Sequence, residues 1–231
     1  MTVASLDELL RELAACRICR DAPLQGRALP HEPRPVIQAS PSARLCIASQ
    51  APGTRVHVSG RPFTDASGKR LRAWLGLDEQ IFYDARRVAI VPMGHCFPGQ
   101  DAKGADLPPR RECAPAWRQR IFAELPALEL ILLIGQYAQT WHLGDAAKDG
   151  LTATVGRWRE ILEGQHRPAL LPLPHPSWRN NGWLKNHPWF ETQLVPQLRK
   201  EVRRLTEVRG RAASADALVE GAQLSPSPSR L

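Results

Sequence analysis

The chain has 231 residues, of which 43% are hydrophobic, and this is enough for one well-filled core but not for two independent ones. Its formal net charge of +8 at pH 7 favours a polyanionic partner, because clustered Arg and Lys side chains gain affinity by releasing counterions from phosphates. No long apolar segment is present, and the acidic residues near the N-terminus argue against a signal peptide. We therefore expect a cytoplasmic protein with no membrane partner.

The first predicted element is a helix over residues 5–18. Ser5 and Glu8 have the spacing of a capping box, and four leucines, Leu6, Leu9, Leu10 and Leu13, fall on one helical face. The end of this helix carries two closely spaced cysteines.

Four short apolar runs follow, and their lengths and compositions are typical of strands buried on both faces. They are Arg44–Ser49, Arg87–Pro92, Leu128–Ile134 and Ala169–Pro174. The stretches between them, chiefly 68–75, 114–125 and 136–143, are compatible with helices. This alternation predicts an α/β fold, a four-stranded parallel sheet between two layers of helices, with ligands bound at the carboxyl ends of the strands.

The last predicted helix covers residues 188–209 and is expected to be interrupted or kinked at Pro196. Beyond residue 210 the composition changes to Ala, Ser, Gly and Pro, which is too poor in large apolar groups to join a core. We therefore expect one domain over residues 1–209, a disordered tail over residues 210–231, and a monomer.

Four of the five cysteines have a spacing that suits metal binding. Cys16 and Cys19 are separated by two residues and Cys96 and Cys113 by sixteen, whereas Cys46 lies inside the first predicted strand. Disulfides are not expected in a reducing compartment. The arrangement suits a [4Fe–4S] cluster or a tetrahedral zinc ion, and spacing alone does not separate the two. Unligated thiols are the remaining alternative.

The segment Gln50, Ala51, Pro52 and Gly53 directly follows the first predicted strand, and so lies at the carboxyl edge of the sheet. Proline sets a turn there, and glycine lets the backbone approach a ligand closely. Taken alone, these residues are more typical of an ordinary turn that leaves a strand than of a ligand site.

Read in order, the motifs resemble those of the uracil-DNA glycosylase superfamily, and most of all its iron–sulfur cluster-bearing branch. Each motif alone is weak evidence for the resemblance, but the ordered set is strong evidence. The likeness runs from Cys16 to about Leu198 through CRIC, SQAPG, GRPF (60–63), DASG (65–68), the Cys96 and Cys113 pair and HPS (175–177). It implies a DNA repair enzyme that hydrolyses the N-glycosidic bond of uracil in DNA and leaves an abasic site. It also favours a structural [4Fe–4S] cluster on the four cysteines over zinc.

Uracil inside a duplex is out of reach, so the nucleotide must be rotated into a pocket and its base recognised there. The resemblance assigns Phe63 to stacking on the base and His175 to donating a hydrogen bond to a uracil oxygen. Removal of one such donor typically costs about a hundredfold in rate. The alternatives are a core phenylalanine and a histidine that satisfies a loop carbonyl.

The chain departs from the family where a carboxylate normally handles the attacking water. In the best-known branch an Asp occupies the place of Ala51, and the cluster-bearing branch has acidic residues at the places of Gln50, Val56 and His57. Gln50 can position a water molecule but cannot act as a base. His57 is the predicted replacement, with Asp65 as runner-up, because a neutral imidazole accepts a proton near neutral pH. An exposed loop histidine is the alternative for His57.

A second departure concerns the choice of base, because the family's selective Asn is replaced by Pro92, which has no donor or acceptor in its side chain. Selectivity for uracil must then come from backbone groups at Met93 and Gly94, or from His95. Three alternatives therefore stay open: a glycosylase for another deaminated base such as hypoxanthine, a protein that binds uracil or abasic DNA with poor turnover, and a hydrolase of small nucleotides or nucleosides.

The segment after His175 mixes aromatic and basic side chains, which suits insertion into a duplex. The expected partner is DNA, single- or double-stranded, that contains uracil or an abasic site. We expect Trp178 or Arg179 to be the inserted group. The predicted DNA-binding set is Ser177, Trp178, Arg179, Asn180 and Lys185. Trp183, Trp189 and Phe190 are better explained as packing residues of the last helix.

Overall fold

The computed structural model describes residues 5–24 and 26–207. Its centre is a four-stranded parallel sheet in the order β2-β1-β3-β4. Leu45 in β1 pairs with Val88 in β2 on one side and with Leu130 in β3 on the other. The strands are β1 (Leu45–Ala48), β2 (Val88–Ile90), β3 (Leu130–Ile134) and β4 (Ala169–Leu173), so each lies inside an apolar run that predicted it.

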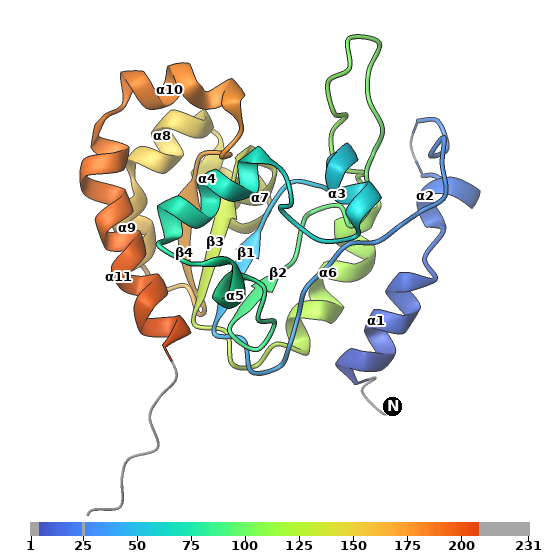
Figure 1. Ribbon diagram of the computed structural model, residues 1–231, viewed down its shortest axis with the longest axis horizontal. Helices are drawn as coiled ribbons and strands as arrows, with labels where there is room; N and C mark the ends of the chain where they lie inside the picture. The colour runs from blue at the N-terminus through green and yellow to red at the C-terminus, as the bar shows by residue number, and fades with distance from the viewer. Residues whose placement is uncertain (1–4, 25, 208–231) are drawn as a thin grey trace, which may run out of the picture.

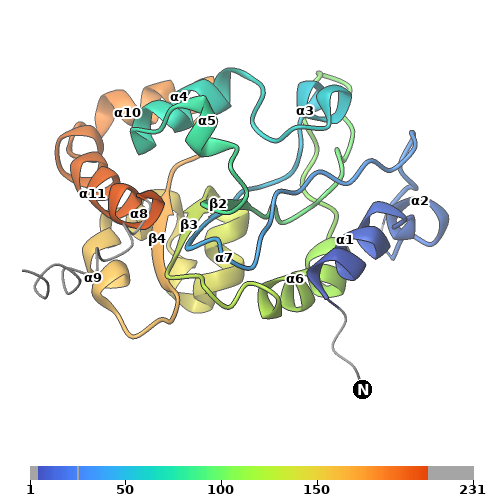
Figure 2. The ribbon, with the colours of Figure 1, turned by 60° about the horizontal axis from the view of Figure 1, so that its bottom comes forward.

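Helices cover both faces of the sheet, which confirms the predicted three-layer α/β architecture (Figures 1 and 2). Successive side chains of β1 alternate between two cores, with Leu45 and Ile47 in one and Cys46 and Ala48 in the other. The first core also contains side chains of α4 (Ala66–Leu75), α5 (Glu79–Phe82), α8 (Gly150–Gly156) and α11 (Val195–Thr206). The second contains those of α1 (Leu6–Ala14), α6 (Cys113–Ala123), α7 (Gln136–Leu143) and, beside β4, α9 (Trp158–Glu163).

The N-terminal helix is shorter than predicted, although its capping box is present. The Ser5 backbone N–H donates to the Glu8 carboxylate at 2.9 Å, and the Glu8 N–H donates back to the Ser5 hydroxyl. Helix α1 ends at Ala14, and a separate short helix, α2 (Ile18–Asp21), follows. The break between them separates Cys16 from Cys19, so the two cysteines do not share one continuous helix.

Two further differences concern short or irregular helical turns. Helix α3 (Thr54–Ser59) lies where the sequence indicated only loop, between Gly53 at its start and Gly60, which has φ +69°, at its end. The last predicted helix begins with a π-helical turn over Phe190–Leu194, and Pro196 lies in the first turn of α11. Proline has no N–H to donate, which explains why the regular hydrogen bonding is interrupted just before it. Residues 208–209 of that helix and the tail over 210–231 lie outside the described residues.

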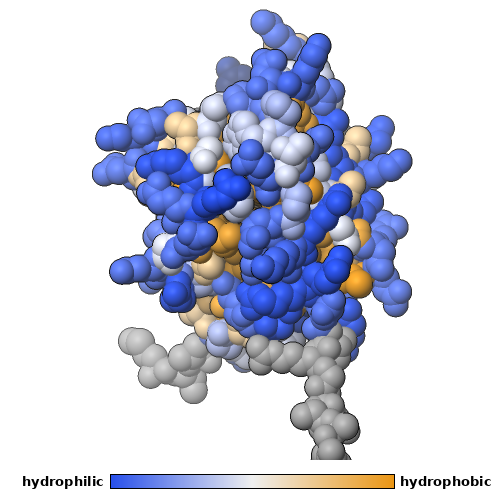
Figure 3. Space-filling view, turned by 90° about the vertical axis from the view of Figure 1, so that its left-hand side faces the viewer, coloured by the Kyte–Doolittle hydropathy of each residue, from blue (hydrophilic) through white to orange (hydrophobic). Residues whose placement is uncertain are grey.

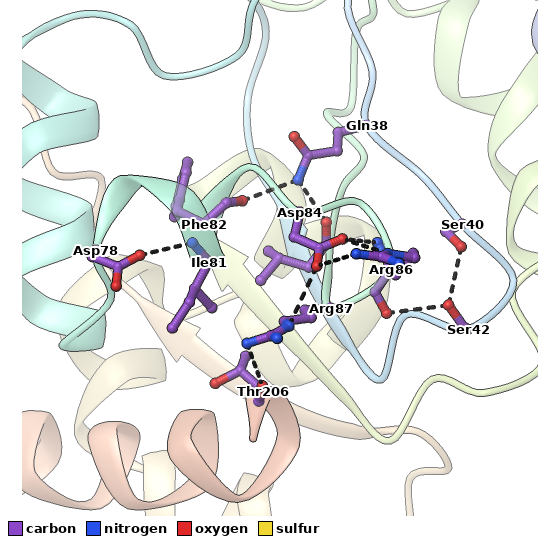
Figure 4. A network of polar contacts seen from close by, with 11 residues as sticks. Gln38, Ser40, Ser42, Asp78, Ile81, Phe82, Asp84, Arg86, Arg87 and Thr206 are labelled. Carbon is purple, nitrogen blue, oxygen red and sulfur yellow. Dashed lines mark hydrogen bonds and ion pairs between the residues drawn. The ribbon is translucent and has the colours of Figure 1, made fainter. Parts of the chain in front are cut away.

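Polar contacts fix the edge strand β2 and the amino ends of the strands (Figure 4). The Gln38 side chain donates to the carbonyl oxygens of Phe82 and Val88 at 3.0 and 2.7 Å. Asp84 pairs with both Arg86 and Arg87, and Arg87 also donates to the backbone carbonyl of Thr206 at the end of α11. These contacts occupy the amino end of the sheet, whereas the predicted functional motifs follow the carboxyl ends of the strands.

The surface over α9, α10 (Asn181–Asn186) and α11 is mostly hydrophilic, with small separate apolar patches (Figure 3). In the described part of the chain, none of the helices has both the length and the apolar character needed to cross a membrane. Large apolar side chains are exposed elsewhere, among them Leu107 and Trp178.

Candidate active site

A cleft of about 710 Å³ opens at the carboxyl edge of the sheet. It is lined by segments that follow β1, β2 and β4, as expected for ligand sites in parallel sheets. Most of the predicted site residues line it: Gln50, Ala51, Pro52, Gly53, Phe63, Asp65, His175, Ser177, Trp178, Arg179 and Asn180. His57, Met93, Gly94 and Lys185 do not.

Phe63 lines the cleft in an unusual backbone conformation. Its φ is +55°, a left-handed value that is rare for an aromatic residue. The residue is largely buried, and its ring makes an edge-to-face contact with the ring of Phe82. The Phe63 carbonyl accepts hydrogen bonds from the Tyr83 hydroxyl at 3.1 Å and from Arg72 at 3.4 Å. A Cβ atom at position 68 would overlap that carbonyl, which explains the glycine there.

His175 lies two residues beyond the end of β4, and its loop is fixed by two side-chain contacts. Asn180 donates to the His175 carbonyl at 2.7 Å, and Arg70 donates to the Ser177 carbonyl at 3.1 Å. A Cβ atom on Gly135 would lie 3.5 Å from the His175 Cβ, which is an ordinary contact distance, so the start of α7 lies beside His175. Burial lowers the pKa of His175 below its usual value, although Asp65 opposes the shift. The imidazole is therefore neutral near pH 7 and carries one N–H donor.

The backbone at Met93 and Gly94 is already occupied. The Met93 N–H donates to the Ser49 carbonyl at 2.8 Å, and the Gly94 N–H donates to the Gln50 carbonyl at 3.0 Å. The Met93 side chain is buried in the second core, while Gly94 and His95 line a different cavity. The two N–H groups are therefore not free for a base, and none of the three residues lines the cleft, whereas Pro92 does.

His57 lies in α3, but away from the cleft. Its ring packs against those of His31 and Phe97, at centroid distances of 4.5 and 5.7 Å. Burial and the neighbouring His31 lower the pKa of His57. This placement removes the geometric reason for assigning water activation to His57. The neighbouring Arg55 lines the cleft instead.

Two carboxylates line the cleft. Asp65, the predicted runner-up, caps helix α4, because its Oδ1 accepts the Gly68 N–H at 3.0 Å. Asp106, which the motifs did not single out, reaches the cleft from the long loop after β2. The only sequence signal for Asp106 is that its loop leaves the sheet at the same edge as the loop of Gln50.

One rim of the cleft combines a large aromatic surface with positive charge. The Trp178 residue is 73% exposed, and the Arg179 guanidinium lies 5.7 Å from the centre of its ring. Arg55, Arg70 and Arg179 all line the cleft, and none of the three forms an ion pair with a carboxylate in the described residues. Lys185, in α10, is exposed outside the cleft lining.

The four predicted cysteine ligands line one small cavity, separate from the cleft. Cys16 and Cys19 come from the N-terminal segment, Cys96 from the loop after β2, and Cys113 is the first residue of α6. The His95 N–H donates to the Cys113 sulfur at 3.3 Å. Among residues 5–24 and 26–207, no three or more Cys, His, Asp or Glu side chains are positioned to hold a single metal ion.

The chemistry of these donors fits a thiolate-bound group. Burial raises the pKa of Cys19 to about 11, and the pKa of Cys96 and of Cys113 to about 12. A thiol of this kind stays protonated at neutral pH unless a bound cation stabilises its thiolate. The amino end of α6 and the His95 N–H both direct positive potential at the Cys113 sulfur, which is the polarity that a thiolate needs.

The fold and the cleft define an α/β protein with a ligand site at the carboxyl edge of its sheet. The model of the uracil DNA glycosylase superfamily matches residues 37–199, and the chain belongs to this superfamily and so to the DNA glycosylases, the hydrolases of DNA base repair. A similar curated protein is the type-4 uracil-DNA glycosylase of Sulfurisphaera tokodaii, with 22% identity over 179 residues, which span 75% of this chain and 74% of that protein.

Proposed function

We propose that the protein removes uracil from DNA by hydrolysing its N-glycosidic bond, leaving an abasic site. The observation that supports this best is that Phe63 and His175, from distant parts of the chain, line the same cleft at the carboxyl edge of the sheet. An aromatic wall and a fixed neutral donor are the two features that recognition of a rotated-out base requires.

In the proposed reaction, the base stacks on Phe63 and accepts a hydrogen bond from the His175 N–H. Negative charge develops on the base as the bond to the sugar breaks, so this donor stabilises the transition state more than the ground state. A neutral imidazole is a suitable donor, because its burial already disfavours the charged form. The backbone carbonyl of Gln50 accepts a hydrogen bond from the Gly94 N–H, and its side chain lines the cleft, where it can contact the base or a water molecule.

A second candidate substrate is another deaminated base such as hypoxanthine. Pro92 favours it, because this residue lines the cleft without any side-chain donor or acceptor that would select the edge of a pyrimidine.

DNA is the proposed partner, and the rim of the cleft supports this. Arg55, Arg70 and Arg179 offer positive charge that no described carboxylate neutralises by an ion pair, and Trp178 offers an exposed apolar wedge beside Arg179. Such a combination holds phosphates while filling the space left by a rotated base. A monomeric, cytoplasmic enzyme remains our expectation from the sequence.

We also propose that Cys16, Cys19, Cys96 and Cys113 hold a [4Fe–4S] cluster, with zinc as the alternative. The shared cavity and the donor geometry around Cys113 support this assignment. When bound, the group would supply a structural link between the N-terminal segment, the loop after β2 and α6, and hydrolysis requires no electron transfer from it.

The test is an assay of purified protein on matched single- and double-stranded oligonucleotides that contain uracil, hypoxanthine or neither. We expect abasic product from the uracil strands, and little or none from the His175→Ala variant. Cleavage only of hypoxanthine would favour the second candidate. Tight binding without multiple turnover would favour a binding protein, and absence of abasic product from every substrate would contradict the proposed activity.

A further inference from the structure

Residues 98–109 form a projecting loop, here called the arm, that stands beside α3 (Figure 1). Its two sides are hydrogen-bonded to each other, because Gln100 bridges to Asp106 and the Leu107 N–H donates to the Gly99 carbonyl at 2.9 Å. At its tip, the Asp101 carboxylate accepts the N–H groups of Lys103 and Ala105, each at 2.9 Å. The arm is therefore an ordered hairpin with internal contacts of its own.

The base of the arm packs on the loop that carries Gln50 and Ala51. A Cβ atom on Gly94 would lie 3.2 Å from the Pro109 Cβ and 3.6 Å from the Ala51 Cβ, so these residues meet closely. A Cβ atom on Gly53 would lie only 3.0 Å from the Asp106 Oδ2. The absence of a side chain at Gly53 thus allows the Asp106 carboxylate to approach the backbone just beyond Ala51.

The Asp106 carboxylate is oriented but not neutralised. Its Oδ1 accepts a hydrogen bond from the Gln100 amide at 3.2 Å, and no cation in the described residues forms an ion pair with it. It lines the same cleft as Arg55, Arg70 and Arg179, which are the proposed phosphate contacts. A carboxylate there repels DNA, so its position is unfavourable for binding and is explained better by a role in the reaction.

We propose that Asp106 is the catalytic carboxylate that orients and deprotonates the attacking water. The inference rests on the proposed glycosylase activity. The bond between C1′ of the sugar and the base nitrogen breaks, and its electron pair leaves with the base, which His175 stabilises. The water oxygen forms a bond to C1′, and the proton that it loses passes to the Asp106 carboxylate. Asp65, the other carboxylate of the cleft, already has a structural role, because its side chain caps α4.

The test compares Asp106→Asn with Asp101→Asn in single-turnover cleavage of a uracil-containing oligonucleotide. Both changes remove one negative charge from the arm and keep an oxygen that can accept its existing hydrogen bonds, but Asp101 does not line the cleft. We expect the Asp106 variant to be slower by about 100-fold, which is typical for loss of a general base, and the Asp101 variant to be as fast as the wild type. Binding to DNA with an abasic-site analogue should be unchanged or tighter in the Asp106 variant, because an anion is removed from the cleft.

A second variant, Asp106→Ala, tests the chemistry directly, because added formate can replace a missing carboxylate. We expect its rate to rise with formate concentration. An active wild type with an equally active Asp106→Asn variant would overturn the inference while leaving the glycosylase activity intact. Equal losses in the Asp101 and Asp106 variants, or no response to formate, would also overturn it, by indicating a role in shaping the arm. An inactive wild type would instead remove the proposed activity and the inference together.

Discussion

Phe63 shows how a single residue is kept in an unfavourable conformation where the cleft needs it. Non-glycine residues with positive φ cost on the order of 1–3 kcal/mol, and persist only when their surroundings fix them. Here the Tyr83 hydroxyl and the Arg72 guanidinium hold the Phe63 carbonyl, and Gly68 leaves room for it. The ring is thus positioned by contacts to its own backbone, independently of any bound base.

This arrangement predicts that Gly68→Ala is destabilising, although alanine is normally the better residue inside a helix. The new Cβ would overlap the Phe63 carbonyl, and overpacking of this kind costs about 1–3 kcal/mol. Thermal or urea unfolding measures the loss, and cleavage of uracil-containing DNA should fall with it because the Phe63 ring must shift. Gly156→Ala in α8 is the matched control, since nothing lies near its added Cβ, and it should be neutral or stabilising. Equal effects of the two changes would contradict this account of Phe63.

At the scale of single elements, α6 begins at the cysteine cavity and directly follows the loop that contributes to the cleft. Cys113 is its first residue, and the loop that precedes it includes the arm and Pro109. Further along the same helix, the buried Arg118 donates to the Val91 carbonyl and to the His142 ring, and no described carboxylate pairs with it. A group bound by the four cysteines would therefore fix the start of the helix that follows the arm.

The cysteine assignment predicts different outcomes for two buried thiols. Cys113→Ala should lose most of the bound iron, or the zinc of the alternative, and should unfold at a lower temperature, because bound metal stabilises the native state. Cys46→Ala is the control, since Cys46 lies inside β1 and does not line the cavity. Iron and zinc per chain, measured by elemental analysis, decide between the cluster and zinc. Equal metal content in both variants, or a wild type that is purified without metal, would contradict the assignment.

The sequence was sufficient for the strands because each lies in a short apolar run between polar, charged, glycine or proline residues. It was not sufficient for α3, because the helix has six residues and so too few for a periodic pattern. A motif gives the position of His57 in the sequence, but it does not give the direction of the side chain. In the structure the His57 ring lies against His31 and Phe97. Asp106 was missed because its position depends on the arm packing against Gly53, a contact between segments distant in sequence.

At the scale of the whole molecule, the positive charge is unevenly distributed. Near the amino ends of the strands, Glu129 bridges Arg44 and Arg204, and Asp84 pairs with Arg86 and Arg87. Each of these four arginines therefore has a carboxylate partner. The cleft at the opposite edge is lined by three arginines without such partners, beside the carboxylates Asp65 and Asp106, and these arginines suit contact with a polyanion.

This distribution predicts that DNA affinity depends on the position of an arginine and not only on net charge. Arg55→Gln should weaken binding of single- or double-stranded DNA of any sequence, and should lower the slope of log affinity against log salt by about 1, because one phosphate contact is lost. Arg86→Gln removes the same charge, but from a side chain paired with Asp84 at the far edge of the sheet, so its slope should equal that of the wild type. Fluorescence anisotropy titrations over a range of salt concentrations give both slopes. Equal slopes for all three proteins would show that DNA does not meet Arg55, and a slope near zero for the wild type would favour a small nucleotide or nucleoside as the substrate instead.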